Sequence, residues 1–266
     1  MMRLFSDLAL SRRLERTEAH GCAMYAEARA KISPAVGAEW MEVAGAYAVF
    51  DGPDSPVTQC FGLGLFEEVN AADFDRIEHF YRERGAATNL EVSPMAGVGF
   101  YQRLHDRGYR PIELSSVLYR ELDGEEPAAA SGVRTRRISP GEEDLWAGVA
   151  ARGWGESADT GFFRDFGRIA ASKRDSVSFL AELDGAPIGA GALSLHDGVA
   201  LLAGACTIPE GRRQGAQLAL LYARLNYAAE RGCELAMMCA EPGSSSQRNA
   251  ERRGFRIAYT RTKWTL

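Results

Sequence analysis

A short turn rich in glycine and arginine, Gly211-Arg212-Arg213-Gln214-Gly215-Ala216, is the stretch of this chain best suited to ligand chemistry. The apolar run before it ends in small and β-branched residues, which is the composition of a buried strand. A proline and a glycine interrupt that strand. From Gln217 onward, Leu218, Leu221 and Leu225 recur at helical spacing. The turn is therefore expected to join a strand to the start of a helix.

The residue types in this turn fit an anionic ligand, in particular a diphosphate. A helix start offers unpaired N–H groups and about half a positive charge. Gly215 lets a phosphate approach the backbone because it has no Cβ, and Arg212 and Arg213 add fixed positive charge. The alternative is a turn that only caps the helix and keeps the surface soluble. The two familiar nucleotide loops, Gly-Lys-Ser/Thr and the three-glycine dinucleotide pattern, are absent from the sequence.

The composition is that of a globular protein. With 266 residues, the chain is long for one domain and sufficient for two of about 130 residues each. Apolar residues make up 46% and charged residues 25%, which are ordinary values. The net charge of −5 argues against a nucleic-acid-binding surface, which is normally basic. No apolar run is long enough to span a bilayer, and the N-terminus becomes charged too early for a secretory signal. We expect a cytoplasmic protein without a membrane partner.

The cysteines and histidines do not form a metal-binding pattern. The five cysteines are odd in number, scattered and mostly in apolar surroundings, which is typical of reduced thiols in a cytoplasmic protein: Cys22, Cys60, Cys206, Cys233 and Cys239. The four histidines are isolated from one another. We therefore expect no metal.

Hydrophobic periodicity and turn residues predict a mixed α/β chain. In the first half they predict a helix capped by Ser6 or Asp7 that runs to about Ala30, helices over 73–84 and 98–107, and strands over 40–50, 57–65, 88–92 and 111–120. In the second half they predict strands over 133–138, 176–183, 187–195 and 199–207, with helices from Ser139-Pro140 to Trp146 and over 161–171. An acidic, turn-rich segment over 122–132 separates the halves. We place the domains at 1–125 and 133–266, with a linker over 126–132.

The two halves share landmarks in the same order. A helix closes at Arg84-Gly85 and again at Arg231-Gly232, and a strand with a proline at its exit follows in each half. A polar helix then ends in Arg107-Gly108-Tyr109 or in Arg253-Gly254-Phe255. Several landmarks in register indicate an internal duplication.

The segment PEGRRQGAQLALL, followed by SSSQRNAERRGF, resembles the acetyl-CoA-binding core of the GNAT family of N-acetyltransferases. The resemblance implies an α/β fold with a mixed sheet and two GNAT-like domains in tandem, of which the first is degenerate. In the first half the expected loop position holds Phe66 to Ala72, where Glu67 and Glu68 would repel a diphosphate. Gln217 departs from the family, which usually has Gly or Ala there.

The resemblance also implies how coenzyme A would be held. The diphosphate would bind Arg212, Arg213, Gln214, Gly215, Ala216 and Gln217. The pantetheine arm would pair with the strand end at Cys206, Thr207 and Ile208, and Asn249 would contact the cofactor. The implied activity is transfer of an acetyl group from acetyl-CoA to the amine of a small molecule or peptide.

The proton-transfer groups depart from the family pattern. Many relatives have a tyrosine where this chain has Ala250. Ser246 is the nearest polar substitute and Glu241 a candidate base, but a helix cap and a solvated strand-end carboxylate are the ordinary alternatives. Cys239 has no histidine partner in the sequence pattern and is interpreted as a core thiol.

The acceptor amine would enter near an aromatic group, Trp154, Phe162 and Phe163, although such aromatics are more often core. Glu156 and Asp159 favour a cationic amine. The competing hypotheses are a catalytically inactive CoA-binding sensor and a first half that docks a partner. The acyl chain length and the oligomeric state are left open, a homodimer included.

Overall fold

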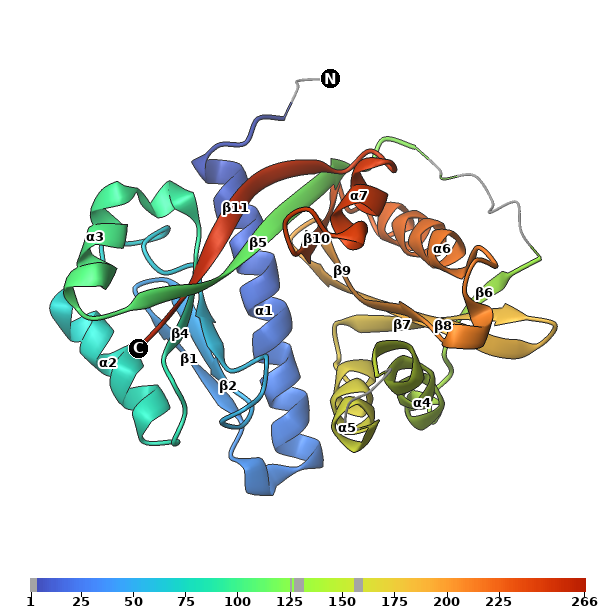
Figure 1. The fold of residues 1–266 in the computed structure, drawn as a ribbon, viewed down its shortest axis with the longest axis horizontal. Coiled ribbons are helices and arrows are strands. Elements are labelled where there is room, and N and C mark those ends of the chain that lie inside the picture. Colours follow the sequence, from blue (N-terminus) through green and yellow to red (C-terminus); the bar gives the residue numbers. More distant parts are fainter. Residues whose placement is uncertain (1–3, 125, 127–131, 156–159) are drawn as a thin grey trace. The chain divides into compact units, whose positions relative to one another are not determined.

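The computed structural model describes residues 4–124, 126, 132–155 and 160–266. The chain forms two compact units, one of residues 1–120 with 237–266 and one of residues 121–236 (Figure 1). The predicted linker over 126–132 lies mostly outside the described residues.

The first unit is a mixed sheet with helices on both faces. Its strands follow the order β1-β2-β3-β4-β11-β5, and all of these neighbours are antiparallel except β3 and β4. Its elements are α1 (Leu8–Ile32), β1 (Glu39–Val43), β2 (Ala46–Phe50), β3 (Gln59–Phe61), α2 (Ala71–Arg82), β4 (Asn89–Val92), α3 (Val98–Asp106), β5 (Arg110–Glu121), β10 (Leu235–Ala240), α7 (Ser245–Glu251) and β11 (Arg256–Thr265), with short 3-10 turns over Pro34–Val36 and Pro94–Ala96.

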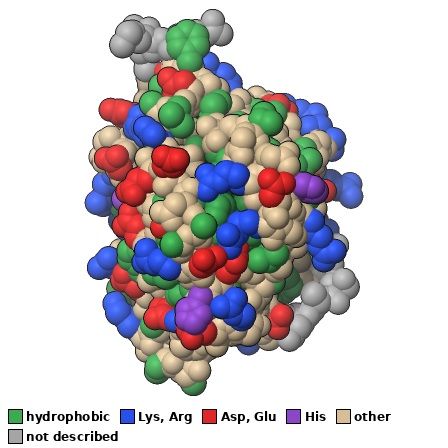
Figure 2. Space-filling view, turned by 90° about the vertical axis from the view of Figure 1, so that its left-hand side faces the viewer, with side chains coloured by type: hydrophobic (Ala, Val, Ile, Leu, Met, Phe, Trp, Pro, Cys, Tyr) green, Lys and Arg blue, Asp and Glu red, His purple; other side chains and the backbone are tan. Residues whose placement is uncertain are grey.

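α1 and α3 begin where the sequence predicts, whereas α2 begins at Ala71, two residues before the predicted Asp73. The Asp7 side chain accepts a hydrogen bond from the Leu10 N–H at 2.9 Å and caps α1. The stripe of Phe74, Ile77, Phe80 and Tyr81 on α2 is buried in a core that α3 and the sheet complete. On the face of the molecule drawn in Figure 2, acidic and basic side chains are interspersed.

Two strand predictions in the first half were wrong. Residues 40–50 form a hairpin rather than one strand, because Ala44 and Gly45 both take left-handed backbone angles, φ 48° and 73°. This turn carries none of the usual Asn-Gly or Asp-Gly signals. The strand predicted over 57–65 is limited to Gln59–Phe61, because the chain turns at Gly62 and Gly64, both with φ 82°.

The last strand of the chain belongs to the first unit. β11 pairs with β4 on one edge, Thr262 opposite Val92, and with β5 on the other, Thr260 opposite Ser116. Residues 237–266 therefore pack with residues 1–120, whereas the sequence-based division groups them with the second half.

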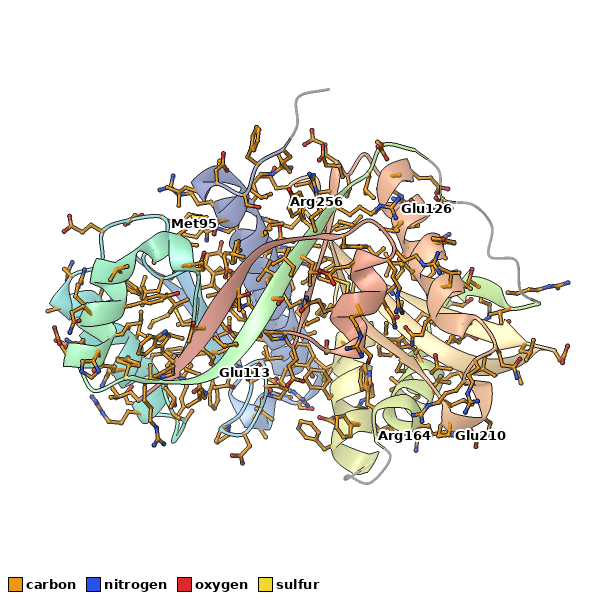
Figure 3. The ribbon with its side chains drawn as sticks, turned by 45° about the horizontal axis from the view of Figure 1, so that its top comes forward. Met95, Glu113, Glu126, Arg164, Glu210 and Arg256 are labelled. Carbon is orange, nitrogen blue, oxygen red and sulfur yellow. The ribbon has the colours of Figure 1, made fainter. Side chains whose placement is uncertain are left out.

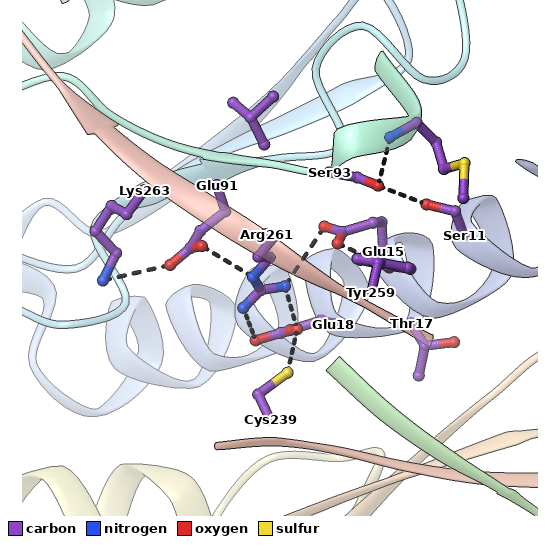
Figure 4. A network of polar contacts seen from close by, with 12 residues as sticks. Ser11, Glu15, Thr17, Glu18, Glu91, Ser93, Cys239, Tyr259, Arg261 and Lys263 are labelled. Carbon is purple, nitrogen blue, oxygen red and sulfur yellow. Dashed lines mark hydrogen bonds and ion pairs between the residues drawn. The ribbon is translucent and has the colours of Figure 1, made fainter. Parts of the chain in front are cut away.

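A buried cluster of charges joins β11 to α1 and β4 (Figure 4). Arg261 donates to Glu18 over 2.6 and 2.8 Å, lies 2.8 Å from Glu91, and donates to Glu15 over 3.5 Å. Lys263 lies 3.3 Å from Glu91. Three carboxylates thus share two cations in the interior.

The second unit is an antiparallel sheet in the order β9-β8-β7-β6. The helices α4 and α5 contact the sheet from one face and α6 from the other (Figure 1). Its elements are β6 (Arg134–Arg137), α4 (Glu143–Trp154), α5 (Thr160–Ala171), β7 (Ser176–Leu183), β8 (Ala186–His196), β9 (Val199–Thr207), η3 (Pro209–Gly211) and α6 (Ala216–Glu230).

The predicted hairpins of this unit are confirmed. Asp184 and Gly185 turn β7 into β8 with φ 51° and 80°, and Asp197 and Gly198 turn β8 into β9 with φ 45° and 71°. Paired left-handed residues match the twist of the strands they join. The helix predicted from Ser139-Pro140 instead begins at Glu143 and continues to Trp154. No helix in the described part of the chain has the length and apolar character that a membrane crossing requires.

Candidate functional site

β9 carries a bulge shortly before the predicted diphosphate turn. Cys206 pairs with Ala190 of β8, but the next pair joins Ala203 to Ala192, so β9 has one residue more than β8 between them. Gly204 accommodates the bulge with φ 65°. A bulge leaves its extra residue without a partner on the neighbouring strand, so backbone polar groups near Gly204 are released from the β8 ladder.

The turn after β9 leads into a helix that has no protein cap. Gly215, with φ 88°, is the N-cap residue and has no side chain to offer. The first helical hydrogen bond runs from the Ala219 N–H to the Gly215 carbonyl over 3.0 Å. The N–H groups of residues 213–218 have no hydrogen-bond acceptor among the described residues. They remain available to an anion at the positive end of α6.

The charges around this helix start favour an anion. The side chains of Arg212, Arg213 and Gln214 are exposed. Glu210, labelled in Figure 3, directly precedes this turn in the sequence. Its Oε1 lies 3.1 Å from Nη2 of Arg152, with which it forms an ion pair. Arg152 thus offsets the charge of Glu210.

Gln217, the departure from the family pattern, has a structural role. Its Nε2 donates to Thr207 Oγ1 over 3.0 Å.

The predicted apolar stripe of α6 was partly wrong: Leu225 is buried, but Leu218 and Leu221 are only half-buried, and Leu220 faces the core instead.

The strand end shapes the turn. Ile208 donates its N–H to the Ile188 carbonyl and accepts from the Gly211 N–H, each over 3.0 Å. A Cβ at Gly211 would lie 2.6 Å from Ile188 Cβ, so only glycine fits there. Cys206 is buried beneath α4, where a Cβ at Gly153 would lie 2.6 Å from its Sγ. Burial raises the pKa of Cys206 to about 11, so its thiol stays protonated.

The aromatic residues predicted near the acceptor site form one cluster. Trp154 lies 6.1 to 6.3 Å from Trp146, Phe163 and Phe166, measured between ring centroids. Phe162 stacks on Phe166 and is 42% exposed. A Cβ at Gly204 would approach Trp146 and Trp154 within 3.3 and 3.5 Å, so the cluster packs against the bulge of β9. Glu156 and Asp159 lie outside the described residues.

The predicted proton-transfer residues lie in the first unit. Glu241 and Ser246 are exposed, and Asn249 accepts from Arg252 over 3.4 Å. The N-cap of α7 is Ser244, which accepts from the Gln247 N–H. Ala250 is buried. Cys239 donates to Glu18 over 3.2 Å, and burial raises its pKa well above the usual value, as suits a core thiol.

The loop of the first half that corresponds to the turn before α6 spans Phe66 to Ala72. A side chain fills the space at this loop, and the helix that follows it is capped. Phe66 occupies the space beside Gly45 and Gly62, where added Cβ atoms would lie 2.5 and 2.7 Å from it, and the Arg16 guanidinium covers its ring at 4.2 Å. Asn70 accepts from the N–H groups of Ala72 and Asp73 and so caps α2. The helix start that is open in α6 is closed in α2 by a capping box.

No group of three or more His, Cys, Asp or Glu residues could hold a metal ion within the described ranges.

The residue that sequence reasoning missed is Arg224, whose side chain is buried between α6 and the β8–β9 pair. The glycines Gly189, Gly191 and Gly204 were the available signal, because glycine inside a strand marks a bulge or a close approach.

Comparison with known proteins agrees with this geometry. Residues 144–255 match the family model described as acetyltransferase (GNAT) family. A GCN5-related N-acetyltransferase from Kribbella flavida has a similar structure, with TM-score 0.66 and 18% identity over 96% of this chain and 95% of that one. A second, from Sphaerobacter thermophilus, has TM-score 0.58 and 18% identity over 83% and 76%. A tandem GNAT protein from the clavulanic acid biosynthesis pathway has TM-score 0.60 and 16% identity over 84% and 78%. No curated protein matches the chain.

The bulged strand, the open helix start and the mixed α/β fold occur together in a chain whose fold is shared with N-acetyltransferases. Residues 144–255 match the acetyltransferase (GNAT) family, and the chain has the fold of GNAT proteins.

Proposed function

We propose that this protein transfers an acetyl group from acetyl-CoA to the amine of a small molecule or peptide. The observation that supports this most strongly is the open N-terminus of α6 behind Gly215, directly after a bulged strand. The counterpart helix α2 is instead capped by the side chains of Asn70 and Asp73.

The residues present fit coenzyme A. The free N–H groups of residues 213–217 and the side chains of Arg212 and Arg213 would hold the diphosphate. Cys206 and Thr207 would align the pantetheine arm through their backbone, while Ile208 shapes the turn with its own internal bonds. When bound, acetyl-CoA supplies an acyl group activated as a thioester.

The chain's own groups would then act on charge and protons. A backbone N–H of the bulged strand would donate to the acyl carbonyl oxygen and stabilise the negative charge that develops there. Glu241 is the proposed base for the attacking amine and Ser246 the proposed acid, both on the family resemblance. Asn249 is proposed to contact the cofactor, and Trp154 and Phe162 to contact the acceptor.

We further propose a tandem arrangement of two GNAT-like halves in a cytoplasmic protein, with the cofactor in the second half alone. The internal repeat in the sequence supports the duplication. The Phe66 side chain and the capping box of α2 support a first half without a diphosphate site.

A matched pair of glycine variants tests the cofactor site. Gly215 and Gly232 stand at opposite ends of α6 with φ 88° and 76°, so Gly→Ala imposes a similar backbone penalty, about 1–2 kcal/mol, at each. We expect Gly215→Ala to weaken CoA binding at least about tenfold in calorimetry, since it distorts the open helix start, and Gly232→Ala to leave binding unchanged. Equal affinity in both variants would exclude the proposed cofactor site.

Transfer itself is tested by thiol release from acetyl-CoA across a panel of amines. The alternative, a catalytically inactive CoA-binding sensor, is favoured by the buried Ala250 at the position where relatives carry tyrosine. Calorimetric binding without thiol release from any amine would establish the sensor.

A further inference from the structure

Arg224, on α6, is a buried cation that is bound only to backbone carbonyls in the described part of the chain. The residue is 3% exposed. Nη1 donates to the carbonyl oxygens of Ala192 on β8, over 3.1 Å, and Ala203 on β9, over 3.3 Å. Nε donates to the carbonyl of Leu220, one turn earlier on α6, over 3.0 Å.

These two carbonyls belong to the residue pair that borders the bulge. Ala192 and Ala203 are opposite each other, and the extra residue of β9 follows directly after them. A bulge disrupts the ladder of hydrogen bonds where it begins. Arg224 supplies a donor at that point to both strands at once.

The glycine at position 191 of β8 leaves room for the Arg224 guanidinium. A Cβ at Gly191, the β8 residue opposite the bulge, would lie 3.3 Å from Arg224 Cζ and 3.4 Å from Nε. Burial lowers the pKa of Arg224 to about 10, so the group keeps its charge at neutral pH. A charged donor makes stronger hydrogen bonds to carbonyls than a neutral one.

We propose that Arg224 is a positioning residue for acyl transfer, which holds the bulge of β9 in the register that frees a backbone N–H for the acyl carbonyl. The inference rests on the proposed function for its catalytic part. Its structural part, the control of the bulge, stands on the contacts of Arg224 alone.

Hydrogen exchange tests the structural part without any substrate. We compare the wild-type protein with Arg224→Met, which keeps a long apolar stem but removes the charge and every donor. Amides in peptides covering 199–207 are expected to exchange at least about tenfold faster in Arg224→Met, while peptides covering 176–183 on β7 keep their wild-type rates. Unchanged exchange over 199–207 would overturn the inference, whatever the activity of the protein.

Kinetics test the catalytic part. In Arg224→Met we expect kcat for acetyl transfer to fall about 10- to 100-fold, because a misplaced N–H stabilises the developing charge poorly, while CoA affinity changes less than threefold. Arg224→Lys keeps the positive charge but lacks the planar guanidinium. We expect its kcat to lie between those of Arg224→Met and wild type. A kcat within twofold of wild type in Arg224→Met would overturn the proposal.

Leu225→Ala, at the adjacent and buried position of α6, is the matched control for simple loss of stability. It is expected to lower Tm but to keep kcat within about twofold when assayed well below Tm. An equal loss of kcat in Leu225→Ala and Arg224→Met would assign Arg224 a purely structural role. Should Arg224→Met not fold, Arg224→Gln, which removes the charge but keeps a polar side chain, decides, since wild-type kcat and wild-type exchange over 199–207 in that folded variant would overturn the proposal. Absence of thiol release by the wild-type protein would instead refute the proposed function.

Discussion

Gln217 Nε2 donates to Thr207 Oγ1 over 3.0 Å, so the first turn of α6 is tied to the last residue of β9. The strand end and the helix start are the two parts of the proposed cofactor site. A side chain that departs from the family pattern therefore adds a link between these parts.

Removing this link is expected to weaken CoA binding slightly. One exposed, neutral hydrogen bond is worth about 0.5–1 kcal/mol, so Gln217→Ala should reduce affinity about two- to fivefold in calorimetry. Thr207→Val should have the same effect, and the double variant should lose no more than either single one. Additive losses in the double variant would show that the two side chains act separately.

Two glycines of α4 are expected to respond oppositely to alanine. At Gly153 a Cβ would lie 2.6 and 2.7 Å from the Sγ and Cβ of Cys206, so Gly153→Ala should cost about 1–3 kcal/mol of unfolding free energy. At Gly148 the nearest atom is the flexible tip of Arg164, 3.4 Å away (Figure 3), so Gly148→Ala should be neutral or stabilising by up to about 1 kcal/mol. Urea denaturation measures both, and equal effects would contradict the close packing of α4 on β9.

The buried charge cluster predicts a pH-dependent stability. Burial raises the pKa of Glu15 to about 7, the nearby Glu18 and Glu91 add to the rise, and Arg261 and the hydrogen bond from Tyr259 oppose it. The folded protein thus holds a proton on Glu15 at pH values where the unfolded chain, with a pKa near 4.5, has lost it. Its contribution to stability falls as pH rises from about 4.5 through 7, by on the order of 3 kcal/mol in all.

Glu15→Gln tests that slope because it removes the titration but keeps a neutral polar side chain. The difference in unfolding free energy between Glu15→Gln and wild type, from urea curves at pH 5.5 and pH 8, should grow in favour of the variant at pH 8.

Glu18 gives the opposite sign: burial alone would raise its pKa, but Arg261 holds the pKa below its usual value. Glu18→Gln should therefore be most destabilising near neutral pH. A Glu15→Gln difference that does not change with pH would show that Glu15 is not protonated in the folded state.

The pairing of β11 predicts that the second half does not fold alone. In a fragment of residues 133–266, β11 would lack β4 and β5 on its two edges, and Arg261 would lose Glu15, Glu18 and Glu91. We expect this fragment to aggregate or to show no cooperative unfolding by circular dichroism, since exposed strand edges promote aggregation. Adding residues 1–120 as a separate chain should restore solubility. A monomeric, cooperatively folded fragment would show that β11 does not depend on the first unit.

Local signals identified most elements and the turn of the candidate site. Asp7 caps α1 and Asp184-Gly185 joins β7 to β8 because capping and hairpin chemistry act over a few residues. The same holds for the turn before α6, where the glycines and arginines and the onset of helical spacing are all within one short stretch. Where a local signal was lacking, as at Ala44-Gly45, the prediction was wrong.

The sequence by itself determined the mixed α/β class, the order of the elements and the open helix start at Gly215, because these follow from neighbouring residues. Only the tertiary structure decided that β11 joins the first unit, that Phe66 fills the first-half loop, and that Arg224 lies against the bulge of β9. Each of these is a choice of partner between residues distant in the chain. Such choices depend on which edges and cavities the rest of the fold leaves open, and spacing along the chain does not specify the partner, although the strand glycines beside Arg224 mark a close approach.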